Sequence, residues 1–148
     1  MRRLYADFVS GPGAVGLLFL RLVAGTAMVY HGLDKIKAPF NWMHGAPVPG
    51  FLQALAALSE FGGGLALIVG LLTPLATLGI ASTMFVAMLS QFTNAVKPTY
   101  FVKPPDPKLP GDAYESAAIY FVIAILLMLI GPGVLSLDAQ LFGKNRRK

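Results

Sequence analysis

Cysteine is absent from the 148-residue chain, which excludes disulfide bonds, thiolate metal sites, covalent haem attachment and thiol redox chemistry on this chain. Charge is also scarce: Asp, Glu, Lys and Arg make up 13% of the residues, against roughly 25% in a soluble domain. With 55% hydrophobic residues and a mean hydropathy of +0.65, the composition disfavours a soluble enzyme, a disordered tail and a nucleic-acid-binding domain. We therefore expect no nucleic-acid partner.

Long stretches of the chain carry almost no charge. Arg21 is the only residue charged at neutral pH in 11–33, Glu60 is the only one in 45–96, and 116–137 contains none. A membrane-spanning helix needs about 20 mainly apolar residues, so these stretches hold four spans once the longest is divided.

The division falls at Thr73-Pro74, because Thr73 can cap a new helix and Pro74 suits its first position. The sequence therefore predicts an all-α fold, a polytopic four-helix membrane bundle that forms a single domain over residues 1–148. The expected spans cover about 13–36, 51–72, 75–95 and 113–132, and a short interfacial helix that Ser136 caps follows over about 136–142.

The sidedness follows from the connections and the cations. Prolines prevent regular helix in 37–50 and 97–112, so both segments are expected to be surface loops. With four spans, both loops lie on one side of the membrane and both chain ends lie on the other. The side of the ends has six Lys and Arg, four of them clustered in 144–148, against five on the loop side. We therefore place both termini in the cytoplasm.

Two charged residues inside the expected spans need an explanation. A charge in the hydrocarbon core costs about 2.5–3.5 kcal/mol on insertion scales, so each needs a partner, water or an escape route. Arg21 can either snorkel to the cytoplasmic headgroups or turn into the bundle. Glu60 is short and lies mid-span, so we expect it to face the interior with a polar partner. Side chains tilt toward their helix N-terminus, which brings Glu60 nearer to His31 than to Arg21.

Helical phase groups the polar residues on one face of each span. Arg21, His31 and Lys35 fall in one arc of the first span, Glu60 lies on a polar and small face of the second, and Gln91 lies on that of the third. We expect these five residues to line a pocket that opens toward the outer leaflet. Whether that face is a working site or a structural clasp stays open.

The small residues have a simpler interpretation as helix-packing positions. Gly62, Ala66 and Gly70 form a ridge of small residues four apart, and Gly79 begins another. Trp42 is typical of an interfacial anchor. The two histidines do not have the spacing of metal ligands, so no metal site is expected.

Five short motifs, in order along the chain, carry a family resemblance. They are Leu20-Arg21-Leu22-x-x-Gly25, His31-Gly32-x-x-Lys35, Glu60-Phe61-Gly62-Gly63-Gly64, Gly70-Leu71-Leu72-Thr73-Pro74 and Gly131-Pro132-Gly133-x-x-Ser136-Leu137-Asp138. In these residues the chain resembles the DoxX family of small bacterial four-helix membrane proteins. The polar positions matched by the resemblance are Arg21, His31, Lys35 and Glu60.

The resemblance implies a place in the bacterial inner membrane, beside quinone-linked oxidoreductases. A related subunit belongs to thiosulfate:quinone oxidoreductase, and other members associate with redox-stress proteins. The chain is accordingly expected to be a quinone-interacting subunit of a membrane oxidoreductase or redox-stress complex, with a bound quinone or lipid and no covalent cofactor. Because it has no redox group of its own, it would act with a partner subunit, or as a homo-oligomer, and whether it is itself an enzyme stays open. The alternative is a non-catalytic accessory subunit of a larger respiratory or photosynthetic assembly.

Overall fold

The computed structural model describes residues 7–44, 46–93 and 112–143, and of 91–93 and 112–114 it describes the backbone alone. These residues form α1 (Pro12–Lys37), α2 (Gly50–Val69), α3 (Thr73–Thr93), α4 (Asp112–Ile130) and a short α5 (Leu137–Phe142). No strand occurs in the described ranges, so the predicted all-α class is confirmed for them. Most of the second proline-rich connection lies outside the described residues.

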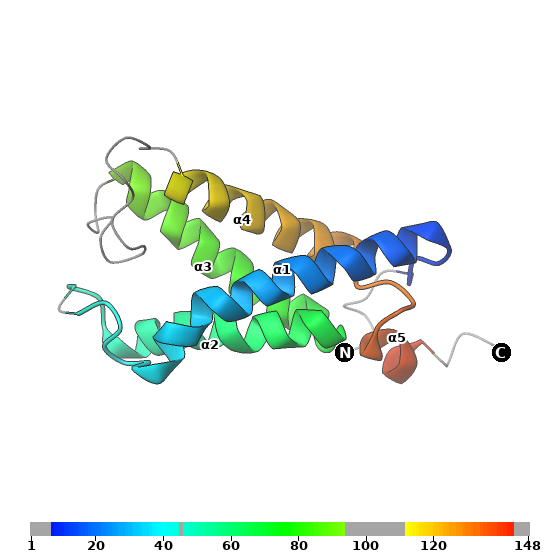
Figure 1. Cartoon of the computed structure of the whole chain (residues 1–148), viewed down its shortest axis with the longest axis horizontal. Coiled ribbons are helices and arrows are strands. Elements are labelled where there is room, and N and C mark those ends of the chain that lie inside the picture. The colour runs from blue at the N-terminus through cyan, green and yellow to red at the C-terminus, as the bar shows by residue number, and fades with distance from the viewer. Residues whose placement is uncertain (1–6, 45, 94–111, 144–148) are drawn as a thin grey trace.

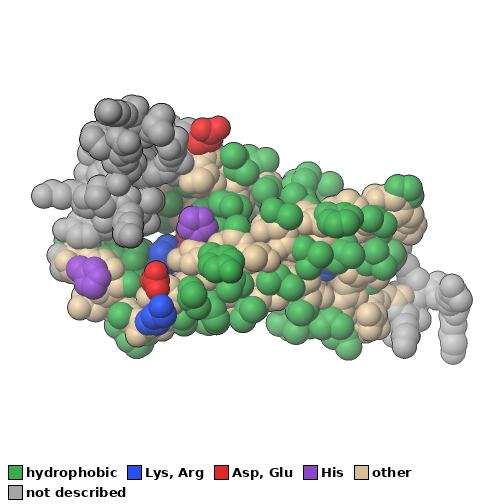
Figure 2. Space-filling view, viewed as in Figure 1, with side chains coloured by type: hydrophobic (Ala, Val, Ile, Leu, Met, Phe, Trp, Pro, Cys, Tyr) green, Lys and Arg blue, Asp and Glu red, His purple; other side chains and the backbone are tan. Residues whose placement is uncertain are grey.

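Three of the described helices are long and apolar enough to cross a membrane: α1, α2 and residues 73–90 of α3. Large apolar side chains point outward from them, with Val23 70% and Leu75 65% exposed, as contact with lipid requires. Figure 2 shows this apolar flank, with Lys, Asp, Glu and His side chains gathered toward the end where α1 finishes. In α4 the apolar stretch Glu115–Ile130 is shorter, so the fourth span stays a prediction.

The long helices pack against one another in chain order, α1 on α2, α2 on α3 and α3 on α4, whereas α1 and α4 make little contact (Figure 1). The core between them is built from fully buried apolar side chains, among them Met28, Leu67, Ile80 and Leu127, one from each long helix. α5 lies at the end of the bundle where α2 turns into α3, and the 38–49 connection lies at the opposite end (Figure 1).

Glycines bring the α1 and α2 backbones into contact. A Cβ on Gly25 would lie 2.8 Å from the carbonyl oxygen of Gly64, and a Cβ on Gly32 would collide with the backbone of Phe61. Small residues allow such close approach, and the resulting dispersion contacts drive helix association where lipid is as apolar as the side chains. The α1–α2 contact therefore depends on Gly25, Gly32 and Gly64.

The four predicted packing residues have different surroundings. Gly79 faces Ser59 of α2, and its Cβ would lie 2.9 Å from the hydroxyl oxygen. Gly62 meets nothing beyond Leu58 of its own helix, and Ala66 is half-buried. Gly70 caps α2 with a φ of +67°, and the Arg21 guanidinium lies directly against it.

The junction between α2 and α3 is held by the C-terminal segment; we call residues 69–73 together with Arg21 and 135–138 the turn clasp. Both carboxylate oxygens of Asp138 accept backbone N–H groups at the start of α3, from Leu72 and Thr73, at 2.8 Å each. The Asp138 N–H in turn donates to the Gly70 carbonyl at 2.9 Å. These bonds satisfy N–H groups that a helix N-terminus leaves without partners.

Two capping predictions can be compared with this geometry. Ser136 does cap α5, since its hydroxyl accepts the Ala139 N–H at 3.1 Å. The prediction that Thr73 caps α3 was wrong: its hydroxyl is buried without a hydrogen-bond partner, and Asp138 from a distant segment supplies the capping oxygens instead.

Candidate functional site

A cavity of about 750 Å³ lies between α2, α3 and α4, near the end where α1 finishes. Most of its wall is apolar, from Leu52, Leu55 and Met84 among others, and its few ionisable side chains come from three helices. They are His31 and Lys35 of α1, Glu60 of α2 and Tyr120 of α4. A mainly apolar cavity with a few convergent polar groups is the usual form of a small-molecule site.

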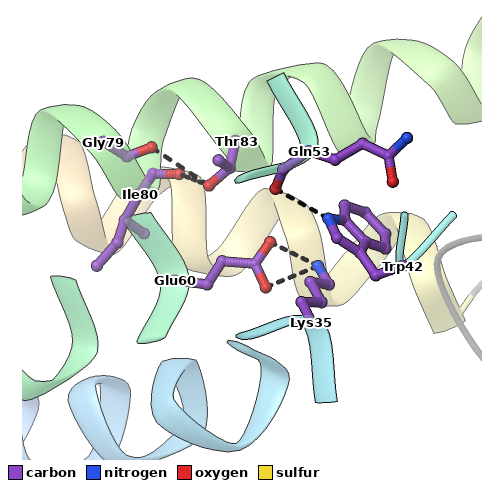
Figure 3. A network of polar contacts seen from close by, with 7 residues as sticks. All are labelled: Lys35, Trp42, Gln53, Glu60, Gly79, Ile80 and Thr83. Atoms are coloured by element: carbon purple, nitrogen blue, oxygen red, sulfur yellow. Dashed lines mark hydrogen bonds and ion pairs between the residues drawn. The ribbon is translucent and has the colours of Figure 1, made fainter. Parts of the chain in front are cut away.

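Lys35 and Glu60 form an ion pair at this cavity (Figure 3). The Lys35 ammonium lies 2.7 Å from each carboxylate oxygen, and the two side chains are 15% and 3% exposed. Burying both charges costs several kcal/mol per ion, which their attraction offsets only in good geometry, and removing one partner typically costs about 3–5 kcal/mol. Glu60 therefore does face the interior, with Lys35 of the neighbouring helix as its partner.

Trp42 covers the ion pair from the 38–49 connection. The Lys35 nitrogen lies 4.5 Å from the centre of the indole ring, within range of a cation–π interaction worth about 0.5–2 kcal/mol. The indole N–H donates to the Gln53 carbonyl at 2.9 Å, as Figure 3 shows. Trp42 thus belongs to the wall of the cavity, a position that its interpretation as an interfacial anchor did not include.

Gln53 fixes the connection that carries Trp42. Its side chain is buried, accepts the Met43 N–H at 3.0 Å and donates to the Val48 carbonyl at 2.9 Å. One amide side chain at the start of α2 therefore holds the connection at two points, before its proline-rich bend and within it. A buried amide with these partners restrains the backbone more than an exposed one could.

His31 and Tyr120 close the cavity between α1 and α4. Their ring centroids lie 5.7 Å apart with planes at 73°, an edge-to-face contact. His31 stands one helical turn before Lys35, so an imidazole, an ammonium and a phenol line the same space. These groups can donate hydrogen bonds to a carbonyl oxygen and can exchange protons with it.

Arg21 is not part of this cavity. It lies fourteen residues before Lys35 on α1, about 21 Å along the helix, and is fully buried in the turn clasp. One of its terminal nitrogens donates to the Leu135 carbonyl, and its charge interacts with that of Asp138. Snorkelling to the headgroups, the alternative left open for Arg21, does not occur. Its place in a common pocket was also wrong, because it lies at the opposite end of α1.

The other predicted site residues are only partly described by the structure. His31, Lys35 and Glu60 are brought together at the cavity, while the side chain of Gln91 lies outside the described residues. Sequence reasoning missed Tyr120, for which a phenol within an aliphatic run of α4 was the available signal. Among the described residues, no group of three or more His, Asp or Glu side chains could hold a metal ion.

Comparisons with known proteins agree with the membrane architecture. A sequence model of the DoxX family matches residues 16–93, which include Arg21, Lys35 and Glu60. The chain is 32% identical over 133 residues to the inner membrane protein YqjF of Escherichia coli (strain K12), across 86% of this chain and 92% of that protein. No solved structure matches the chain significantly.

Proposed function

Because the chain belongs to the DoxX family of integral membrane proteins, we propose that it binds the ring of a quinone in the cavity beside Lys35 and Glu60. In this proposal it crosses the bacterial inner membrane four times with both termini in the cytoplasm. It serves as a subunit of a membrane oxidoreductase or redox-stress complex, together with a partner protein or a second copy of itself.

The four-span arrangement has support from helix length. α4 has 19 residues, which corresponds to about 28 Å, close to the roughly 30 Å thickness of the hydrocarbon core. It packs antiparallel to α3 along the apolar core, so that both lie at the same depth. The cytoplasmic position of the termini rests on the cations at 144–148.

The observation that carries the quinone proposal is the combination of apolar walls with donors at one place. A quinone ring needs a slot that excludes water, and its two carbonyl oxygens need hydrogen-bond donors. The Lys35 ammonium and the ring groups of His31 and Tyr120 lie on the cavity wall, so the residues present fit that requirement. A bound quinone supplies electron and proton transfer, and the chain's own residues orient its ring and hold protons at its oxygens.

Trp42 can serve as a fluorescent probe of quinone binding. It is the single tryptophan of the chain and lies on the cavity wall, so binding of a quinone should quench its fluorescence saturably in reconstituted membranes. The matched variant is the double substitution Lys35→Met and Glu60→Met, which removes both charges together and avoids leaving one of them buried without a partner. We expect saturable quenching in the wild type and its loss in the double variant, with folding retained.

A second candidate function has its own observation. Lys35 binds both carboxylate oxygens of Glu60, as it would in a structural clasp of an accessory subunit. Unchanged quinone affinity in the double variant would show that the ion pair does not recognise the ring. Absence of saturable quenching in the wild type would favour the accessory role.

A further inference from the structure

The cavity continues well beyond the ion pair. From Trp42 and Lys35 its wall runs along α2 and α3 to Ala66 and Leu75, close to the turn that joins the two helices. From Leu52 to Ala66 the α2 wall rises fourteen residues, about 21 Å. A quinone ring alone would occupy one end of such a space and leave the rest empty.

The extension faces lipid. Its rim is formed by side chains that point outward from the two spans: Leu55 and Leu58 on α2, and Leu75, Leu78 and Val86 on α3, each more than half exposed. In a membrane this rim borders the hydrocarbon, so a ligand enters sideways from the bilayer and not from water.

Small residues line part of the extension. Gly62 and Ala66 of α2 and Gly79 of α3 all lie on its wall, and a Cβ on Gly62 would meet nothing except the Leu58 side chain of its own helix. The space above Gly62 is therefore not used for contact between α2 and another helix. It belongs to the elongated part of the cavity, called the channel below, that joins the polar groups to the bilayer.

We propose that this channel between α2 and α3 holds a single apolar chain of the ligand, which makes the ligand class a lipid-soluble quinone with a linear isoprenoid tail. This inference rests on the proposed function, since the ring is taken to lie beside Lys35 and Glu60. The wall extends about 21 Å along α2, which leaves room for an extended chain beyond the ring, whereas the phosphate of a phospholipid would lie against the Glu60 carboxylate. The hydrogen-bond donors at the Lys35 end of the channel suit the carbonyl oxygens of a quinone ring. The tail reaches the bilayer between the leucine side chains of the rim.

The variant that tests the channel is Gly62→Leu. It adds a side chain to the channel wall without breaking a helix contact, so the protein should fold, while a tail in the channel would be overpacked. The matched control is Gly16→Leu on α1, where an added Cβ meets nothing within 4 Å. Both substitutions replace glycine with leucine inside an exposed or half-exposed helical position, so their effects on helix propensity are alike.

Saturable quenching of Trp42 is measured with two quinones that share one ring, one with a long isoprenoid tail and one without a tail. We expect Gly62→Leu to weaken binding of the tailed quinone about tenfold or more, to leave the tailless quinone within about twofold, and Gly16→Leu to change neither. For each quinone, the effect is the ratio of the dissociation constant of the variant to that of the wild type. This ratio removes the difference between the two quinones in partitioning into the bilayer.

The outcomes separate the two proposals. If the wild type binds neither quinone, the proposed function fails. If it binds both and Gly62→Leu affects them equally or not at all, the ring site stands and the tail channel is refuted. Displacement of the tailed quinone by phospholipid, with a phospholipid retained by the purified wild type and lost from Gly62→Leu, would also overturn the assignment of the channel to a quinone tail.

Discussion

Asp138 is expected to be an important polar residue for the stability of this protein. Its carboxylate accepts two backbone N–H groups at the start of α3, its own N–H donates to Gly70, and the opposite charge of the buried Arg21 lies nearby. The residue is fully buried, so neither water nor lipid headgroups can replace these partners. One residue thus joins the α2–α3 turn to the segment that leads into α5.

The substitution Asp138→Asn keeps the shape and removes the charge. The amide can offer one oxygen to the two N–H groups and places an N–H₂ donor against the other, and Arg21 loses the opposing charge. Hydrogen bonds to charged groups contribute about 1.5–3 kcal/mol each, and a buried unsatisfied donor costs about 1–3 kcal/mol. Since these effects overlap, we expect the free energy of unfolding to fall by about 2–4 kcal/mol.

The measurement is reversible unfolding in mixed detergent micelles, followed by circular dichroism. The matched control is Asp34→Asn, the same chemical change at an aspartate whose side chain is 89% exposed and pairs with Lys37 on the surface; the stability of this variant should equal that of the wild type. The double variant Arg21→Met with Asp138→Asn should lose less than the sum of the two single losses, because no unpaired charge is left buried.

Two results would refute this reasoning. A loss below about 1 kcal/mol for Asp138→Asn would mean that the capping bonds to Leu72 and Thr73 contribute little. Strict additivity of the Arg21 and Asp138 substitutions would mean that the two charges do not interact across the turn clasp.

Two further predictions concern the cavity and the topology. Gln53→Leu removes the bonds to Met43 and Val48, so the Trp42 emission maximum should shift and quinone affinity should fall several-fold. Gln140→Leu, the same change at an exposed residue of α5 at the opposite end of the bundle, should leave the emission unchanged, and an unshifted spectrum in Gln53→Leu would contradict the role of Gln53. A cysteine introduced at Asn41 should react with a membrane-impermeant reagent from the periplasm and one at Lys144 should not, and the reverse pattern, or labelling of both, would overturn the assigned sidedness.

Charge distribution, together with the prolines and the capping residues, was sufficient to predict the helices. The absence of charge on either side of Arg21 and Glu60 requires long apolar helices, and the polar, proline-rich segments between them cannot continue a helix. Each observed helix end lies within three residues of the expected one, because local sequence decides where a helix can start and stop. The Ser136 cap of α5 was predictable for the same reason, since its partner is three residues away.

Helical phase identified polar faces but not their partners. It placed Arg21, His31 and Lys35 on one face of α1. Residues on one face can still lie far apart along the helix axis, and Arg21 and Lys35 belong to sites at opposite ends of the helix. Lys35 pairs with Glu60 because α1 and α2 meet at Gly25, Gly32 and Gly64, which fixes their relative rotation and depth.

The sequence by itself determined that this chain forms apolar helices with buried polar faces, because composition and periodicity act over one helix turn or one span. Only the tertiary structure decided that Asp138 caps α3, that Trp42 covers Lys35 and that Gly62 lines an open channel. The Trp42 contact joins residues seven apart, the Asp138 cap joins residues more than sixty apart, and the channel depends on empty space between helices. They are set by the packing of the whole bundle, which no local pattern encodes.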